Sequence, residues 1–361
     1  MKSLEAFRDK ELVQLLIEEI GRIAPPSVNL MEVCGGHTMA IQKAGLPSLL
    51  PPGIRLLSGP GCPVCVTSYD FIDQALALIR KEKVTITTYG DLIRVPGSGG
   101  NLAEARALGA DIRVVYSLLE AIEMARKEPQ KEIVFLGIGF ETTAPATAAG
   151  LDLAVKEKLR NFSVFSAHKV MIPAMDALLE QGSPIHGYIC PGHVSAITGS
   201  EVYRHLPSRF GACCVISGFE AVDILESILM LVKQYVSHEP VVEIQYRRVV
   251  RPEGNLKARE LMDKYFELKD DWWRGLGVIP YSGLKIRPEY AAWNAEEKFG
   301  MQAVENKEPP GCICGLVLKG VKTPADCPLF ANICQPSDPV GACMVSSEGA
   351  CHAHYLYRED G

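Results

Sequence analysis

The stretch GPGCPVC, residues 59–65, decides how the rest of this chain is interpreted. It follows the apolar run IRLL and precedes VTSYDFIDQALALIRKE, in which apolar residues recur at helical spacing. Glycine and proline are the strongest breakers of regular structure, so we expect a loop between a strand and a helix. Cys62 should lie on that loop and Cys65 in the first turn of the helix. The pattern therefore predicts a strand–loop–helix unit of an α/β fold.

Two cysteines at a helix start indicate chemistry rather than packing. Unpaired backbone N–H groups and the positive end of the helix dipole stabilise a thiolate, which predicts a lowered thiol pKa for Cys62 and Cys65. A C-x-x-C pair in an intracellular protein is typical of a redox or metal site. The alternative is a pair of half-buried cysteines that pack as small apolar side chains. The flanking glycines and prolines favour an exposed loop and hence the functional interpretation.

Composition bounds the class of protein. The chain has 361 residues, enough for two or three domains. Its hydrophobic content of 47% and charged content of 22% are ordinary for a soluble globular protein. A formal net charge of −6, without a cluster of lysine and arginine, argues against a nucleic-acid partner. The N-terminus lacks the apolar core of a signal peptide and the apolar runs are too short to span a bilayer, so we expect a cytoplasmic protein that does not bind membranes.

Strand and helix patterns alternate between residues 28 and 240, which predicts parallel sheets covered by helices. Gly-Phe-Glu follows a strand at 139–141 and again at 218–220. The pattern TITTYGDLIRVP also recurs as SVFSAHKVMIP about 80 residues later. We therefore predict two similar parallel-sheet α/β domains related by internal duplication, at 28–155 and 156–240.

The two ends of the chain have a different character. Residues 4–23 predict an amphipathic helix, 255–273 a second helix, and 274–294 a loop. The remainder, to residue 361, is rich in cysteine, proline and glycine, and it has little periodicity. Such a segment buries too little apolar surface to fold without a metal. We expect the N-terminal helix to pack against it, so that 1–27 and 241–361 form a third, irregular α+β domain.

Several polar and thiol side chains fall just beyond the carboxyl ends of the expected strands. Ligands of open α/β sheets bind outside these ends, so we expect the two sheets to share a cleft. The candidates on such loops are Cys34, Cys62, Cys65, Glu141, His193 and Glu220. The alternatives are a buried strand-end thiol for Cys34 and the capping of loops and helix starts for Glu141 and His193.

Twelve cysteines are many for a cytoplasmic chain, and six of them lie in the last 50 residues. These six are spaced C-x-C-x12-C-x6-C-x8-C-x7-C, without the paired C-x2-C knuckles of zinc ribbons. Long, uneven spacings on proline-flanked loops favour an iron–sulfur cluster over zinc, and disulfides are the weakest alternative. Two of the six must be spare, and spacing does not decide between Cys312 and Cys314 as the first ligand.

Five motifs in order along nearly the whole chain carry a family resemblance: VCGGHT (33–38), GPGCPVC (59–65), GFETTAP (139–145), PGHVSAITG (191–199) and DCPLF…C…MVSSEGAC (326–351). Together they resemble the HypD family of NiFe-hydrogenase maturation proteins. The resemblance implies two similar α/β domains and a third domain with a 4Fe-4S cluster. Its cluster motif falls on Cys312, Cys327, Cys334 and Cys351, with Cys314 the rival for the first position.

The same resemblance implies partners and roles. The protein would form a stable complex with the chaperone HypC and carry the iron on which Fe(CN)2CO is assembled, with cyanide delivered transiently by HypE. Cys34 matches the iron ligand shared with HypC, and Cys62 and Cys65 match a dithiol between cleft and cluster. From the residue types we expect that dithiol to relay electrons to the iron, and His193 and Glu141 to line the cleft.

On this interpretation the chain is a metal-centre assembly scaffold, monomeric by itself, rather than a turnover enzyme. Two other classes compete with it. A freestanding thiol–disulfide oxidoreductase would have no need of Cys34 or the cysteine-rich tail. A structural zinc protein is disfavoured by the missing knuckles.

Overall fold

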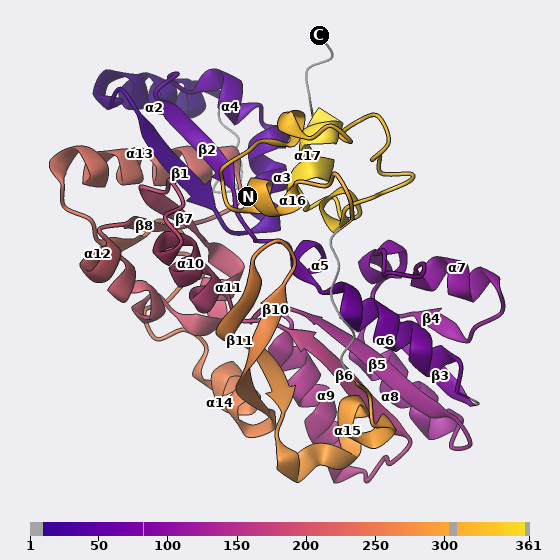
Figure 1. Cartoon of the computed structure of the whole chain (residues 1–361). Coiled ribbons are helices and arrows are strands. Elements are labelled where there is room, and N and C mark those ends of the chain that lie inside the picture. Colours follow the sequence, from indigo (N-terminus) through magenta and orange to yellow (C-terminus); the bar gives the residue numbers. More distant parts are fainter. Residues whose placement is uncertain (1–9, 82, 303–308, 358–361) are drawn as a thin grey trace.

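The computed structural model describes residues 10–81, 83–302 and 309–357. It contains a five-stranded and a four-stranded parallel sheet, together with a two-stranded antiparallel pair (Figure 1). Helices follow most of the parallel strands in sequence, as expected from the alternation of patterns. The predicted α/β class with two parallel sheets is therefore confirmed.

The first sheet has the strand order β2–β1–β7–β8–β9. Its strands are β1 (Val28–Glu32), β2 (Ile54–Ser58), β7 (Gly187–Pro191), β8 (Cys213–Ser217) and β9 (Val242–Ile244). Every neighbouring pair is parallel, for example Leu30 with Leu56 and Leu30 with Gly187. All of the strand carboxyl ends therefore lie at one edge of this sheet.

The second sheet has the order β4–β3–β5–β6 and is also parallel throughout. Its strands are β3 (Val84–Thr88), β4 (Ile112–Val114), β5 (Glu132–Gly139) and β6 (Phe162–His168). β3 and β6 are buried along their whole length, and β5 is buried from its second residue, because helices and the antiparallel pair cover them. This explains why β5 is an almost continuous apolar run, and why the Thr and Ser side chains of β3 and β6 are buried as well.

Sheet membership does not follow the two predicted ranges. The strands of residues 28–58 lie in the same sheet as β7, β8 and β9, whereas β6, from the range 156–240, lies in the other sheet. Parallel strands pair where their buried faces match. Because a helical crossover connects them, strands that are neighbours in a sheet can be far apart in the sequence. β1 has an almost fully buried sequence and accordingly lies inside the sheet, between β2 and β7.

The helices of the two α/β units connect these strands. They are α3 (Gly35–Lys43), α4 (Leu46–Leu49), α5 (Pro63–Val66), α6 (Tyr69–Ile79), α7 (Leu102–Ala107), α8 (Leu118–Lys127), α9 (Ala144–Lys156), α10 (Met171–Glu180), α11 (Gly192–Thr198), α12 (His205–Phe210) and α13 (Ala221–Ser237), with 3-10 turns η2 (Gly90–Arg94) and η3 (Glu201–Tyr203). Among the described residues, no helix is long and apolar enough to cross a membrane.

The N-terminal helix does not pack where we expected. α2 (Lys10–Ile23) lies on α13 of the first α/β unit, with Leu16 and Ile20 buried in the same apolar cluster as Leu225. Residues 4–9 of the expected helix lie outside the described residues. The apolar stripe of α2 finds its partner on α13 because that longer helix presents a matching apolar face. The expectation that this helix packs against the cysteine-rich segment is wrong.

The expected helix over 255–273 is only half helical. α14 (Leu256–Tyr265) is followed directly by β10 (Phe266–Trp273), which pairs antiparallel with β11 (Gly277–Ile286) in the region predicted to be a loop. The alternation of FELKDDWW, buried at both ends of β10, was the missed signal. Gly275 and Gly277 adopt positive φ angles of 77° and 83° in and after the tight turn, which side chains rarely tolerate.

The β10–β11 hairpin lies along β6 and covers the edge of the second sheet. Val170 N–H donates to the Ser282 carbonyl at 2.9 Å, and the Ser166 hydroxyl donates to the Leu284 carbonyl at 2.9 Å. The buried Lys169 ammonium forms an ion pair with Asp271 of β10. These contacts hold the hairpin beside the carboxyl end of the second sheet.

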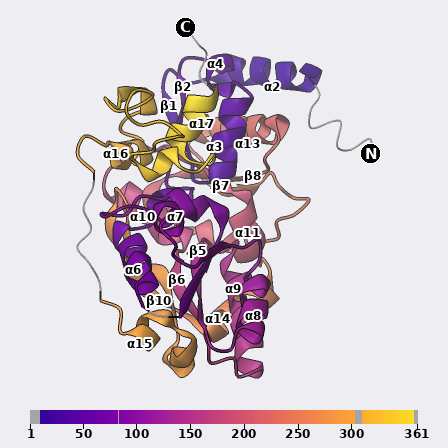
Figure 2. The same ribbon diagram turned by 90° about the vertical axis from the view of Figure 1, so that its right-hand side faces the viewer.

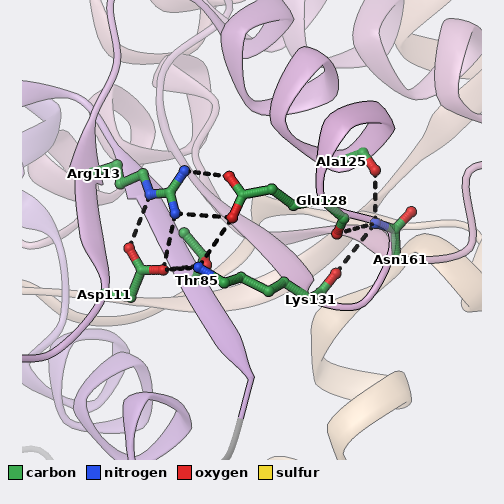
Figure 3. Close-up of polar contacts among 7 residues, drawn as sticks. All are labelled: Thr85, Asp111, Arg113, Ala125, Glu128, Lys131 and Asn161. Atoms are coloured by element: carbon green, nitrogen blue, oxygen red, sulfur yellow. Dashed lines mark hydrogen bonds and ion pairs between the residues drawn. The ribbon is translucent and has the colours of Figure 1, made fainter.

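A polar network joins the opposite, amino-terminal edge of that sheet (Figure 3). Arg113 forms ion pairs with Asp111 and Glu128, and Lys131 bridges the same two carboxylates. These charges hold the pKa of Asp111 and of Glu128 well below the usual range. Because the ion pairs are partly exposed, each one contributes little to the free energy of folding. As a network, they hold the starts of β4 and β5 together.

Between residues 309 and 357 the cysteine-rich segment contains short helices: α16 (Cys314–Leu318), η5 (Pro324–Asp326), η6 (Ala342–Met344) and α17 (Ala350–Tyr357). Before it lie η4 (Pro288–Trp293) and α15 (Ala295–Phe299). α17 packs against α3 and η6 against α5, so this segment covers the strand ends of the first sheet (Figures 1 and 2). It thereby lies beside the loops that carry Cys34 and Cys62.

Candidate functional site

Cys34 lies at the junction of β1 and α3 and is the N-cap residue of that helix. Its loop is bonded to the GPGCPVC loop through the backbone: Gly35 N–H donates to the Gly61 carbonyl at 3.0 Å, and Gly59 N–H donates to the Glu32 carbonyl at 2.8 Å. A Cβ atom on Gly61 would lie 2.1 Å from the Cys34 nitrogen. Only glycine allows the two loops to approach this closely.

The strand–loop–helix prediction for GPGCPVC is confirmed, because Cys62 caps α5 and Cys65 lies within it. Cys65 N–H donates to the Cys62 sulfur at 3.4 Å. The expected exposure is wrong: Cys62 is 3% and Cys65 1% exposed. The cysteine-rich segment covers the loop, and burial together with neighbouring thiols raises the pKa of Cys65 well above its usual range instead of lowering it.

The two sheets do share a cleft, of about 310 Å³, at their strand ends. It is lined by loops after β1, β2, β5 and β7 and by one residue of the C-terminal segment: Val33, Cys34, Gly36, Gly61, Pro63, Phe140, Thr142, Thr143, Pro191, His193, Val194 and Glu348. Two larger hollows, each of about 510 Å³, lie elsewhere on the surface and contain no cysteine. Unlike these two hollows, the cleft combines a thiol with imidazole, hydroxyl and carboxylate groups.

Two histidines stack on the two faces of Phe219 beside this cleft. The ring centroids are 4.0 Å apart for His193 and Phe219, and 4.5 Å apart for His37 and Phe219. His37 is fully buried, which lowers its pKa to about 4, and its Nε2 lies 2.9 Å from the Gly218 carbonyl. His37 is therefore a neutral positioning group, whereas His193 reaches the cleft as predicted.

Glu141 does not line the cleft, although its neighbours Phe140, Thr142 and Thr143 do. It is buried behind them, and one carboxylate oxygen accepts the Met171 N–H at 3.0 Å. The other oxygen has no hydrogen-bond partner among the described residues. Burial raises the pKa of Glu141 to about 7. Glu220, the corresponding residue after β8, forms a capping box with Asp223 at the start of α13.

Sequence reasoning missed two carboxylates next to Cys34. Glu32 is buried, accepts the Cys34 N–H at 3.1 Å and the Thr38 hydroxyl, and burial raises its pKa to about 8. Glu348 comes from the C-terminal segment and lines the cleft. An acidic residue inside the apolar strand VNLMEV was the available signal for Glu32. Glu348 lies within the quoted MVSSEGAC motif but could not be placed without the fold.

The thiols of the C-terminal segment meet the GPGCPVC loop at Cys343, a residue that the predicted ligand set omits. The thiols of Cys314, Cys351 and Cys65 lie next to the Cys343 sulfur. Their interaction with that sulfur lowers the pKa of Cys343 well below its usual range, which favours its thiolate. Cys62, Cys65, Cys314, Cys343 and Cys351 therefore form one buried group, which we call the thiol cluster.

The remaining cysteines of the segment lie around this cluster. The sulfur atoms of Cys312 and Cys314 are 3.2 Å apart. Burial raises the pKa of Cys334, and the nearby Cys314 and Cys312 thiols raise it further. No hydrogen bond joins the Cys327 thiol to another thiol within the described residues, and that side chain is half-buried. The thiols contact one another, and in the described part of the chain no group of three histidine, cysteine or acidic side chains surrounds the space of a single metal ion.

These observations test whether an iron–sulfur cluster fits. The donors are soft sulfur atoms, they are buried, and one of them is favoured as a thiolate, which is the donor chemistry that such clusters require. The residues therefore fit a thiolate-bound cluster. The fold and site define the class: a two-sheet α/β protein whose cleft cysteine adjoins a buried, cysteine-rich thiol site.

Comparison with known proteins identifies the family. A family model described as HypD, Hydrogenase formation hypA family, matches residues 11–358. The chain is 47% identical to Hydrogenase maturation factor HypD2 of Bradyrhizobium diazoefficiens, across 99% of this chain and 97% of the relative. It is 46% identical to Hydrogenase maturation factor HypD of Rhizobium leguminosarum, across 99% and 96%. The corresponding factor of Cupriavidus necator is 45% identical, across 99% and 97%. The chain belongs to the HypD family of hydrogenase maturation factors.

Proposed function

We propose that this protein is the scaffold on which the Fe(CN)2CO group of NiFe-hydrogenase is assembled. It would act in a stable complex with HypC and accept cyanide from HypE. Before it binds these partners, it would be a cytoplasmic monomer. Membership of the HypD family supports the maturation role. One observation carries the mechanism: the cleft cysteine, the GPGCPVC loop and the C-terminal thiols are connected by direct contacts.

Cys34 would bind the cargo iron together with a cysteine of HypC. Its sulfur is partly buried at the cleft, and desolvation raises its thiol pKa, so the thiolate forms when a metal displaces the proton. Val33, Phe140 and Val194 give the cleft apolar walls that limit the access of water to cyanide and CO ligands. The Glu32 carboxyl holds the Cys34 backbone in place through its N–H group.

A resident 4Fe-4S cluster would supply one-electron redox chemistry. Cys312, Cys327, Cys334 and Cys351 remain the set predicted from the family motif. The contacts favour Cys343 in place of Cys327 and Cys314 in place of Cys312, because Cys351 contacts both Cys343 and Cys314, and no contact of Cys327 with these thiols is found in the described part of the chain.

Cys62 and Cys65 lie between the cleft and the C-terminal thiols, where they would alternate between dithiol and disulfide. Oxidation of the pair would release two electrons and two protons, which would be taken up when a thiocyanate on HypE is cleaved to a thiol and hydrogen cyanide. Cys65 contacts Cys343 on one side, and the Cys62 loop is bonded to the Cys34 loop on the other. A freestanding oxidoreductase is less consistent with this arrangement, because a thiol that is only 3% exposed, as Cys62 is, cannot reach the disulfide of a protein substrate.

His193 would hydrogen-bond the cargo or its ligating thiolate from the cleft wall. Glu141 lies behind that wall with a pKa near neutrality, so it would hold a proton close to Thr142 and Thr143. The infrared spectra described below for the scaffold also test these roles of His193 and Glu141.

The test is the infrared spectrum of the purified complex with HypC. We expect bands of iron-bound cyanide and CO in the wild type and none in Cys62→Ala, whose cluster absorption should persist. Cys213→Ala is the matched control, because Cys213 is a buried thiol of β8 in a different apolar cluster. If Cys62→Ala still carries iron with cyanide, the relay is wrong. If the wild type is colourless and contains zinc, the scaffold role is wrong.

A further inference from the structure

The first sheet ends in an open edge at β9, the last strand in the order β2–β1–β7–β8–β9. Gln245 N–H donates to the Ile216 carbonyl of β8 at 3.0 Å. Backbone groups of successive residues in a strand point to opposite sides, so those of Val242 and Ile244 face away from β8. In the described part of the chain no further strand pairs with that side. An open edge of this kind can take up an added strand.

A preformed hollow lies along this edge. It is one of the two larger hollows, of about 510 Å³, and the residues of β9 are part of its lining. Val242, Ile244 and Val250 give it apolar surface, and Ser200 and Pro252 belong to its wall. Ser200 N–H donates to the Pro252 carbonyl at 3.0 Å, so the backbone holds that wall in place. A space formed before the ligand arrives lowers the conformational cost of binding.

The lining of the hollow carries positive charge that the chain does not neutralise. Arg204, Arg247 and Arg251 face Glu201 and Glu243, and three arginines against two glutamates leave a formal charge of +1. Arg204 forms an ion pair with Glu201, and Glu243 accepts a hydrogen bond from an amide of α13. Arg247 and Arg251 donate to backbone carbonyls at 2.9 and 3.2 Å. No ion pair joins either of these two arginines to a carboxylate among the described residues.

Nearby charged side chains have other partners or lie outside the hollow. Arg248 forms an ion pair with the buried Asp223, and the exposed Glu253 is not part of the lining. The edge strand of the second sheet, β4, differs in this respect, because its Arg113 forms ion pairs with two carboxylates of the same chain. The β9 edge therefore combines free backbone donors with arginines that remain available to an anion.

We propose that the β9 edge binds an extended, acidic peptide segment of a partner protein, an inference that goes beyond the assembly role. The peptide adds as a strand to the first sheet, and its carbonyls accept the N–H groups of Val242 and Ile244. The Val242 carbonyl accepts a peptide N–H, whereas the Ile244 carbonyl already accepts the Arg247 Nε at 2.9 Å. Acidic side chains two residues apart lie on one face of the added strand and pair with Arg247 and Arg251.

The test uses the full chain and a fluorescent five-residue peptide of alternating glutamate and valine, with binding followed by fluorescence anisotropy. For the double variant Arg247→Gln with Arg251→Gln we expect about tenfold weaker binding, because two partly exposed ion pairs are lost. The double variant Arg80→Gln with Arg106→Gln is the matched control. It removes the same charge from exposed positions at α6 and α7, so it should bind as tightly as the wild type. A peptide of alternating lysine and valine should not bind.

A glutamate–valine peptide that is methylated at its backbone nitrogens tests the added strand without any change to the protein. Methylation removes the N–H groups that a strand offers to its neighbour, so we expect binding to be lost. No binding of the unmethylated peptide to the wild type, or equal binding to the Arg247 and Arg251 variant, would overturn the proposal. Full binding of the methylated peptide would also overturn it, because charge alone would then explain the affinity. A wild-type dimer that dissociates in the double variant, measured by sedimentation, would assign the edge to a second copy instead and refute the partner peptide.

Discussion

Gly61 is the position at which the fold can be tested most directly, because the Cys34 and GPGCPVC loops touch there through their backbones. In Gly61→Ala the new methyl group would lie 2.1 Å from the Cys34 nitrogen, 2.4 Å from its Cα and 2.4 Å from the Val33 carbonyl carbon. All three are backbone atoms, so no side-chain rotation relieves the clash. The loops must therefore separate by about 1.4 Å to bring the methyl carbon and the Cys34 nitrogen to van der Waals contact.

The cost has two parts. Inserting a methyl group into a filled space costs about 1–3 kcal/mol. Separation also weakens the bond from Gly35 N–H to the Gly61 carbonyl, worth about 1 kcal/mol. We expect the free energy of unfolding of Gly61→Ala to fall by about 2–4 kcal/mol, measured by urea unfolding of the metal-free protein.

Gly99→Ala is the control, because nothing lies within 4 Å of a Cβ at that position. Its free energy of unfolding should stay within about 0.5 kcal/mol of the wild type. Opening the loop contact should also raise the alkylation rate of Cys34 in Gly61→Ala alone. If Gly61→Ala and Gly99→Ala unfold at the same urea concentration, the close approach of the two loops is not real.

Two further predictions concern the thiols and the buried acid. Cys343→Ser should lose most of the iron and sulfide that the protein binds on reconstitution, whereas Cys327→Ser should keep more. The reason is that Cys343, unlike Cys327, contacts other thiols in the described part of the chain. Equal losses in the two variants, measured by iron analysis, would contradict this assignment. For Glu32 the folded pKa of about 8 lies above the unfolded value of 4.5, so the folded state holds the proton more tightly. The free energy of unfolding should therefore fall between pH 4.5 and 8, by at most about 1.4 kcal/mol per pH unit. Glu32→Gln should flatten this slope in urea unfolding measured at pH 5 and pH 8, and an unchanged slope would show that Glu32 is not the group responsible.

The local elements could be predicted because they depend on residues close in sequence. Apolar runs bounded by glycine and proline marked the parallel strands, and the breakers of GPGCPVC placed Cys62 at a helix start. The hairpin strand β10 was misread because its residues follow a strong helix former without a breaker between them. Its pairing with β11 and its packing along β6 overrode the local preference.

The sequence by itself determined the α/β class, the family and the residues that can do thiol chemistry. It placed Cys34, Cys62 and His193 on strand-end loops, because the end of a strand is a local feature. Only the tertiary structure decided that Cys343 lies among the other thiols, that Glu141 is behind the cleft wall, and that the GPGCPVC thiols are buried. Burial and contact depend on segments hundreds of residues away, here the C-terminal segment packed on α3 and α5, and no local pattern contains that information.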